Sequence, residues 1–345
     1  AYNWGDHQDL WDKNALRVWT QPQSFNQQIL SKFDRYLDEW AQKICNSEAK
    51  YIGFSVLDSN VLFTNELARR IKSGSAKILF AGGPEVQNKH TRVKLDECFD
   101  YFFSGEGEEA IGDWIKWHEE GQDGEIPEGV YRASDGLFRD VPFRAINNLN
   151  SFPLPDYSDF PLKLYTEQAL PILGSRSCIF KCKFCTDYQS MGSFRSLDDR
   201  RLFESLMQAV DLGFQKVWFN DLLINGIIKE LKSAFKALDT EGKFLEWIAL
   251  ATPNKQLKDD DLIFFRSHGL KTLNLGLESG SNKVMRLMRK GFDHQSASEA
   301  LKRIHSSGIN TQLNMIVGFP GENEEDFQET LDFLDEHYQI GRAHV

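Results

Sequence analysis

From about residue 170 onward, short apolar runs alternate with amphipathic segments, and this alternation limits the folds that the chain can adopt. Five apolar runs predict strands at Pro171–Gly174, Lys216–Asn220, Trp247–Ala251, Thr272–Leu277 and Thr311–Val317. Helical patterns lie between and after them, near residues 199–212, 226–240, 257–267, 295–307 and 324–336. Five successive strand–helix units predict an α/β fold with a parallel sheet, either barrel-like or open. In both architectures the active site lies at the carboxyl ends of the strands.

A similar alternation of apolar runs and helical patterns lies before residue 170 and predicts a separate doubly wound sheet. Apolar residues at three- and four-residue steps predict a helix from Phe25 to Ile44. Short apolar runs then predict strands, with helical patterns between them and after the last one, at Tyr51–Leu57, Lys77–Ala81 and Tyr101–Phe103. At roughly 150 residues per domain, a chain of 345 residues fits two such domains.

The stretch between the two alternations is rich in Gly and Asp and then in Pro, which predicts a linker with a short β excursion. The predicted organisation is therefore a Rossmann-like, flavodoxin-like domain over 1–120, a linker over 121–169 and a second domain over 170–339. The first residue is Ala1, and the segment 340–345 resembles the translated read-through of a sequencing adaptor. We therefore expect 340–345 to be a non-native tail and both domains to be truncated, the first at its opening strand.

Charge and composition exclude several classes of protein. Lys and Arg number 40 and Asp and Glu 51, a net charge of −11, so no nucleic-acid partner is expected. No apolar run approaches the roughly 18 residues of a membrane span, and no signal peptide opens the chain. The five cysteines are an odd number in a long chain, which predicts a reducing, cytoplasmic location rather than a disulfide framework.

Three of the cysteines, Cys178, Cys182 and Cys185, follow the first predicted strand of the second domain. Thiolates are soft ligands that both iron–sulfur clusters and zinc select. Structural zinc usually takes four ligands in two separated pairs, whereas here a single loop supplies three. An iron–sulfur cluster with three protein ligands leaves one iron open, which suits chemistry. Zinc and reactive thiols remain alternatives at this point.

The C-x₃-C-x₂-C spacing, with an aromatic residue before the last cysteine, resembles the radical S-adenosylmethionine (radical SAM) superfamily. The resemblance implies a partial (β/α)₆ barrel in the second domain, and a [4Fe–4S] cluster held by Cys178, Cys182 and Cys185. It also implies that the open iron binds S-adenosylmethionine, whose reductive cleavage releases a 5′-deoxyadenosyl radical. Beyond the cluster ligands, no catalytic residue is assigned.

The same resemblance suggests further contacts with S-adenosylmethionine. It places Phe184 near the adenine and Glu278 and Ser279 near the ribose, with Gly318 at a strand end close to the adenine. The family's Gly-Gly-Glu motif is absent after the second strand, where Asp221 is the candidate for the amino group of the cofactor. Each of these residues also has a simpler interpretation, as a core side chain, a helix cap or a turn.

In the first domain, Ser55 and Leu57 at one strand end and Gly82 and Gly83 at the next resemble two of three motifs of cobalamin (B12)-binding domains. In that family these residues let the nucleotide tail of cobalamin thread into the sheet. The third motif, Asp-x-His-x-x-Gly, is not found. The alternative is a flavodoxin-like domain that binds no cobalamin.

These resemblances together imply a radical SAM enzyme, and methyl transfer to an unactivated carbon with cobalamin is the leading reaction. A cobalamin-assisted cyclisation or rearrangement comes second and methylthiolation third, while a cobalamin or Fe–S sensor without catalysis is the alternative of another class. The expected partners are an external electron donor such as flavodoxin or ferredoxin and a small-molecule or peptide substrate, which the sequence does not identify.

Overall fold

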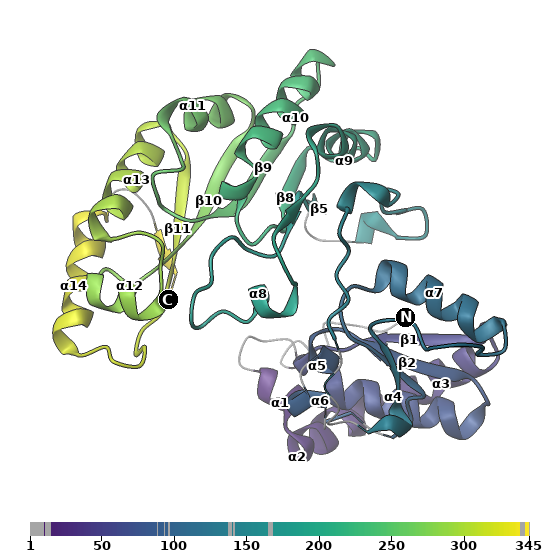
Figure 1. The fold of residues 1–345 in the computed structure, drawn as a ribbon. Coiled ribbons are helices and arrows are strands. Elements are labelled where there is room, and N and C mark those ends of the chain that lie inside the picture. Colours follow the sequence, from purple (N-terminus) through teal and green to yellow (C-terminus); the bar gives the residue numbers. More distant parts are fainter. Residues whose placement is uncertain are drawn as a thin grey trace. The chain divides into compact units, whose positions relative to one another are not determined.

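The computed structural model describes residues 10, 15–87, 89–92, 94–95, 97–136, 140, 142–164, 168–338 and 342–344. It forms two compact units, Ala1–Ile146 and Asn147–Val345 (Figure 1). Among the helices of these described residues, none has both the length and the apolar character needed to cross a membrane.

The first unit contains a four-stranded sheet in the order β1-β2-β3-β4. Strands β1 (Tyr51–Ser55), β2 (Ile78–Gly82) and β3 (Tyr101–Phe103) run parallel, and β4 (Val130–Arg132) pairs with β3 in the antiparallel direction. The parallel strands lie where the apolar runs predict them.

Helices cover both faces of this sheet, because successive residues of each strand point to opposite sides. Leu79 and Ala81 of β2 belong to one core cluster, together with residues of α3 (Ser31–Cys45) and α4 (Val61–Gly74). Phe80 packs into a second cluster, with Trp114 of α7 (Gly107–Glu119). The first unit is therefore doubly wound, as predicted.

The helix predicted from Phe25 begins as a π-helix, η3 (Phe25–Leu30), and continues as α3. The other helical segments of this unit are short, and they are α1 (Leu16–Thr20), α2 (Pro22–Ser24), η4 (Asp58–Asn60), α5 (Pro84–Gln87), α6 (Lys89–Arg92) and η5 (Ala133–Asp135).

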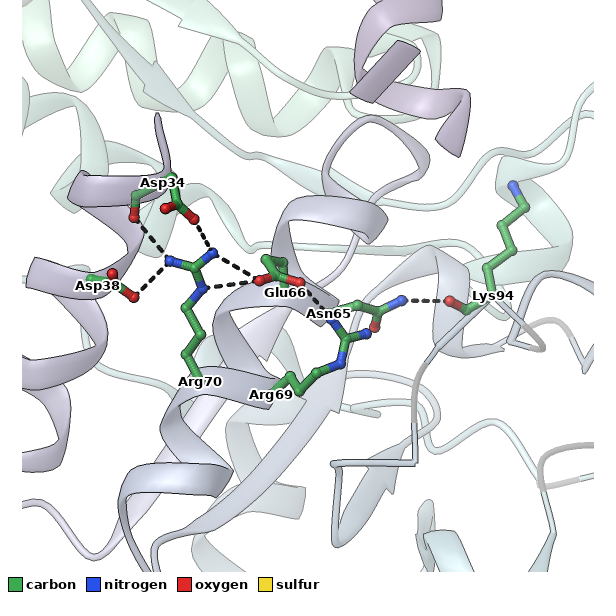
Figure 2. Close-up of polar contacts among 7 residues, drawn as sticks. All are labelled: Asp34, Asp38, Asn65, Glu66, Arg69, Arg70 and Lys94. Atoms are coloured by element: carbon green, nitrogen blue, oxygen red, sulfur yellow. Dashed lines mark hydrogen bonds and ion pairs between the residues drawn. The ribbon is translucent and has the colours of Figure 1, made fainter. Parts of the chain in front are cut away.

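A charged cluster joins α3 to α4 (Figure 2). The guanidinium of Arg70 on α4 donates to the carboxylates of Asp34 and Asp38 on α3, at 2.6 and 2.7 Å. It also donates to the Asp34 carbonyl oxygen at 2.9 Å and to Glu66, one turn earlier on α4, at 2.9 Å. The Arg70 side chain is only 17% exposed, so these contacts are partly shielded from solvent. Charge-assisted hydrogen bonds from one guanidinium to groups of both helices hold the two helices together.

The second unit contains a six-stranded sheet in the order β12-β11-β10-β9-β8-β5, in which every neighbouring pair is parallel. Its strands are β5 (Ala169–Ile172), β8 (Lys216–Phe219), β9 (Glu246–Ala251), β10 (Leu270–Glu278), β11 (Asn310–Met315) and β12 (Arg342–His344). The strands follow chain order, and within the described residues the sheet is open at β5 and β12. β12 falls inside the segment predicted to be a non-native tail, and that assignment stays a prediction.

Long helices follow the strands and bury one face of the sheet. They are α9 (Asp199–Asp211), α10 (Ile228–Thr240), α11 (Asp259–Ser267), α13 (His294–Ser306) and α14 (Glu324–Glu336), with short helices η6 (Leu149–Ser151), η7 (Leu162–Leu164), α8 (Asp187–Ser190), η8 (Ile224–Gly226) and α12 (Asn282–Met288) elsewhere. Figure 1 shows the long helices following the curve of the sheet. One continuous core joins them to the sheet through alternate strand residues such as Val217, Phe219, Trp247 and Ala249. The remaining strand residues face the other side.

We predict that removing the α3–α4 contact lowers the stability of the first unit. Arg70→Met leaves the carboxylates of Asp34, Asp38 and Glu66 close together without their shared cation, which should lower the free energy of unfolding by about 1–2 kcal/mol. Urea denaturation of the full chain, followed by fluorescence, measures the change. The control is Arg35→Met, which removes an exposed contact with Glu39 and should leave the stability nearly unchanged, because solvent screens that contact. Equal effects of the two variants would contradict the prediction.

Candidate active site

A cavity of about 170 Å³ lies at the carboxyl ends of the central strands of the second unit. Cys178, Cys182 and Cys185 line it from the loop that follows β5. The ends of β10 and β11 contribute Glu278 and Asn314 to the lining of the same cavity. The structure thus brings the three predicted cluster ligands together at the edge of the sheet where parallel α/β folds bind their ligands.

The loop that carries the cysteines is held at its base and near its middle. Two short strands, β6 (Ser175–Arg176) and β7 (Arg195–Ser196), pair in the antiparallel direction and close its base. The hydroxyl of Ser177 donates to the Gly192 carbonyl oxygen at 2.7 Å. Further along, the backbone N–H of Lys183 donates to the carbonyl oxygen of Met288, the last residue of α12, at 2.9 Å. The cysteine loop therefore has a defined shape against α12.

Cys178 and Cys182 are half-buried, and this disfavours their ionised form. Burial raises the pKa of both; the neighbouring thiols raise the pKa of Cys178 further, and Cys185 and Glu278 raise that of Cys182. The ammonium of Lys290 acts in the opposite direction on both cysteines. Metal ligation requires thiolates, so a positively charged centre among the three sulfurs would remove this penalty.

The donor set fits an iron–sulfur cluster. Within the described part of the chain, no three His, Cys, Asp or Glu side chains were found grouped for a single metal ion. In a [4Fe–4S] cluster each cysteine binds a different iron, so its ligands surround the cluster rather than meet at one point. Three soft thiol ligands around one cavity suit this arrangement, with one iron left open.

Glu278 and Lys290 form an ion pair on the wall of the cavity. The Lys290 Nζ lies 3.5 Å from Glu278 Oε1, and the two side chains are 6% and 12% exposed. Burial raises the pKa of Glu278, and Lys290 opposes this shift. Gly276 provides the space for the pair, because a Cβ at that position would lie 2.9 Å from Glu278 Oε1.

Aromatic rings surround the ammonium of Lys290. Its Nζ lies 5.6 Å from the ring centroid of Phe184 and 5.4 Å from that of Phe292, within the range of cation–π interactions. Phe184 also lines the cavity, in agreement with its expected position at the site, although its contact with adenine stays a prediction.

Strained backbone lies next to the site. Four non-glycine residues of the described chain have a positive φ, and three of them, Ser177, Glu278 and Arg289, flank or line the cavity. Ser177 (φ 69°) precedes Cys178, Arg289 (φ 58°) precedes Lys290, and Glu278 (φ 72°) follows a register shift between β10 and β11. Non-glycine residues in this conformation are uncommon and gather at functional sites. In this structure, these three backbone positions place Cys178, Glu278 and Lys290 at the same cavity.

The carboxylate of Asp221 accepts hydrogen bonds from the chain itself. Asp221 lies just after β8, and its side chain is buried. Its carboxylate accepts the Gly174 N–H at 2.9 Å and the Ser175 hydroxyl at 2.5 Å. Asp221 thus fixes the start of the cysteine loop, and the described cavity lining does not include it. Burial raises its pKa to about 6, which the two hydrogen bonds partly oppose. Its contact with S-adenosylmethionine stays a prediction.

Ser279 and Gly318 also lie outside the described lining of the cavity. The Ser279 hydroxyl is fully buried and shares a hydrogen bond of 3.1 Å with Thr330 of α14. Gly318 follows β11 with a φ of 77°, and its N–H donates to the Glu322 carboxylate. These contacts are structural, and the predicted roles of both residues toward S-adenosylmethionine stay predictions.

The sequence reasoning missed Lys290 and Phe292, which line the cavity. α12 ends at Met288, and Lys290 turns into the site. A signal for this was the basic pair followed by Gly291, a pattern typical of a helix end. The reasoning also missed Asn225, whose amide group bonds both the N–H and the carbonyl oxygen of Thr252, a residue of the cavity wall.

In the first unit, the four residues predicted to bind cobalamin lie at the carboxyl ends of β1 and β2. Ser55 is exposed and faces Gly82 in the parallel register, and the Val56 N–H donates to the Gly82 carbonyl oxygen at 2.8 Å. Gly83 has a φ of 102°, and a Cβ there would lie 2.7 Å from the Val56 carbonyl oxygen. Leu57 is 48% exposed, which is high for a leucine. The structure therefore brings Ser55, Leu57, Gly82 and Gly83 to one sheet edge.

Comparison with known proteins agrees with this organisation. Residues 172–334 match the model of the radical SAM superfamily, so this part of the chain is a radical SAM domain and the predicted family is confirmed. Members of this superfamily use a [4Fe–4S] cluster and S-adenosylmethionine, and they take an electron from an external donor.

Solved structures extend the likeness to both units. The cobalamin-dependent S-adenosylmethionine radical enzyme OxsB resembles 86% of this chain with a TM-score of 0.74 and 18% identity, over 45% of its own length. The radical S-adenosylmethionine methyltransferase TsrM from Kitasatospora setae, whose structure holds cobalamin and a [4Fe–4S] cluster, resembles 93% of this chain with a TM-score of 0.69 and 14% identity, over 67% of its length. The chain therefore has the fold of radical SAM enzymes that carry a B12-type domain.

Among curated proteins, an uncharacterized methyltransferase of Pyrococcus horikoshii is 25% identical over 73% of this chain and 56% of its own length. The threonylcarbamoyladenosine tRNA methylthiotransferase MtaB of Bacillus subtilis is 25% identical over 59% of this chain and 47% of its own length. The chain spans about half the length of these curated relatives.

We predict that the buried Asp221 makes stability fall as pH rises. Its pKa is raised from 3.8 to about 6 in the folded chain, so its favourable contribution is complete below about pH 3.8 and is lost as pH rises through about 6. Asp221→Asn keeps the shape and removes the titration. Between pH 4.5 and 7.5, the stability of the variant relative to the parent should rise by about 2 kcal/mol. Urea denaturation at both pH values measures this, and a difference that does not change with pH would contradict it.

Proposed function

We propose that this protein cleaves S-adenosylmethionine reductively at a [4Fe–4S] cluster and uses the resulting radical for cobalamin-dependent methyl transfer to an unactivated carbon of its substrate. The observation that carries the first part is that Cys178, Cys182 and Cys185 line one cavity together with the ends of β10 and β11. When bound, the cluster supplies one electron to the sulfonium of S-adenosylmethionine.

The residues of the chain would bind, orient and shield the cofactors. The three thiolates would ligate three irons and leave the fourth for S-adenosylmethionine. Phe180, Phe184 and Phe292 give the cavity apolar walls that would exclude water from a reactive radical. Asn225 holds the backbone of Thr252 in the wall, so that the groups offered by the β9 end keep their positions.

The cobalamin part of the proposal rests on the first unit. Ser55, Leu57, Gly82 and Gly83 share one sheet edge, where parallel α/β folds take their ligands. The exposed Ser55 and the absence of a side chain at Gly82 and Gly83 leave the backbone accessible to a long ligand tail. The likeness to OxsB and TsrM supports the same proposal, since OxsB is a cobalamin-dependent enzyme and the structure of TsrM holds cobalamin.

Methylthiolation is the second candidate, because MtaB and several tRNA-2-methylthio-N(6)-dimethylallyladenosine synthases are among the relatives of this chain. That reaction usually requires additional cysteine ligands in an N-terminal domain. The first unit offers only Cys45 and Cys98. The Cys45 thiol lies 3.7 Å from the Ile71 carbonyl oxygen, and both cysteines pack against the core of the unit. The side chains of this stretch of chain therefore favour methyl transfer.

The cluster can be tested by anaerobic reconstitution of the chain with iron and sulfide. Iron and sulfide near four per chain are expected, and reduction should convert S-adenosylmethionine to 5′-deoxyadenosine. Cys182→Ala should abolish the cluster and the cleavage, because it removes one of three ligands. Cys98→Ala, outside the site, should retain both. A Cys182→Ala protein that keeps four irons and cleaves S-adenosylmethionine would overturn the assignment.

Cobalamin binding can be tested by refolding the chain with hydroxocobalamin and measuring bound corrinoid by its absorbance after gel filtration. The parent chain should retain corrinoid, whereas Ser55→Leu should reduce retention at least tenfold by placing apolar bulk at the entry between β1 and β2. Ser73→Leu is the control, because Ser73 is also exposed but lies near the end of α4. Absence of bound corrinoid from the parent would leave the radical SAM part intact and refute the cobalamin part.

A further inference from the structure

The buried ammonium of Lys290 is a charged group at the candidate active site to which the proposed function assigns no role. Its side chain is 6% exposed, and lysine is rarely buried to this extent without a partner. Glu278 supplies that partner at 3.5 Å, which is long for a strong ion pair. Glu278 therefore balances the charge of the ammonium only in part, and this charge can act on other groups in the same cavity.

Several contacts fix this ammonium close to the cysteine loop. The Phe184 ring, from the residue directly before Cys185, lies 5.6 Å from Lys290 Nζ. The Phe180 ring packs against Gly291, the residue that follows Lys290. The loop backbone bonds to the end of α12 through Lys183 N–H and Met288 O at 2.9 Å. Several contacts thus fix the position of Lys290 next to the cysteine loop.

The charges around the cavity are strongly unequal. Among the described residues that line it, the potential anions are the three thiolates, Asp187 and Glu278, and Lys290 is the only base. Lys181 and Lys183 of the same loop are exposed, so solvent and salt screen them. A buried cation is screened much less, and its field reaches every group in the cavity.

We propose that Lys290, positioned by Glu278 and the rings of Phe184 and Phe292, is the counter-charge of the iron–sulfur cluster and raises its reduction potential. This inference rests on the cluster of the proposed function. Reduction adds one electron, taken from an external donor, and therefore one negative charge to the cluster. A fixed cation nearby stabilises the reduced form more than the oxidised form, and Glu278 has the opposite effect. Lys290 is a positioning residue in this scheme, because it acts through the cluster.

The test measures the midpoint potential of the reconstituted full chain, without S-adenosylmethionine, by a redox titration followed by electron paramagnetic resonance. Lys290→Met keeps the apolar stem and removes the charge, so it should shift the reduction equilibrium about tenfold toward the oxidised cluster, or about 59 mV for one electron. Lys290→Arg keeps the charge and should remain near the parent value. Glu278→Gln removes the opposing charge and should shift the potential in the positive direction. Lys302→Met, an exposed control with the same change in net charge, should leave it unchanged.

The opposite signs for Lys290→Met and Glu278→Gln are the decisive result, because general damage to the site would move both variants in the same way. Equal potentials for the parent and Lys290→Met, or shifts of the same sign for the two variants, would overturn the inference. If Lys290→Met assembles no cluster, Glu278→Gln decides, and the absence of a positive shift overturns the inference. A parent chain that assembles no cluster would instead refute the proposed function, so the two failures differ.

Discussion

Burial of acidic groups is the constraint on which the candidate site of the second unit depends. Three thiols, Asp187 and Glu278 line one small cavity, and burial raises the pKa of Cys178, Cys182 and Glu278, so that their ionised forms are disfavoured there. Burying charge without compensation is costly, so a fold keeps such a group of acids only where cations balance it. The positive charge of Lys290 offsets part of the cost of burying these acids. An iron–sulfur cluster would offset the larger part. The site is thus built to receive positive charge.

The backbone around the cavity is shaped by this requirement. The register shift after Gly276 and the positive φ of Glu278 turn a strand end so that its carboxylate meets Lys290. On the other side, β6 and β7 close the base of the cysteine loop, and Asp221 binds the two residues that begin it. Rigid strands therefore fix the positions of the side chains, and the loops carry the cysteines that would bind the cluster.

Much of this arrangement was predictable from the sequence, because it depends on local patterns. Short apolar runs located the parallel strands, amphipathic patterns located the long helices, and the cysteine spacing located the loop. Lys290 was not predictable in the same way, because its role depends on where α12 ends and on which rings fold over it. Ser279 lies in a stretch that resembles the family, and the burial of its hydroxyl beside Thr330 depends on the packing of α14, which local sequence does not specify.

Asp221 and Glu278 show how one type of side chain acquires two roles from its surroundings. Both lie at the carboxyl ends of strands, both are buried, and burial raises the pKa of both. Asp221 finds two donors in the adjacent loop, and these hydrogen bonds occupy its two oxygens. Glu278 has a single distant cation and lines the cavity, so its oxygens remain available to a ligand. A strand-end carboxylate with local donors stabilises the scaffold, whereas one with an incomplete partner set is the better candidate for binding, and sequence position alone does not distinguish the two.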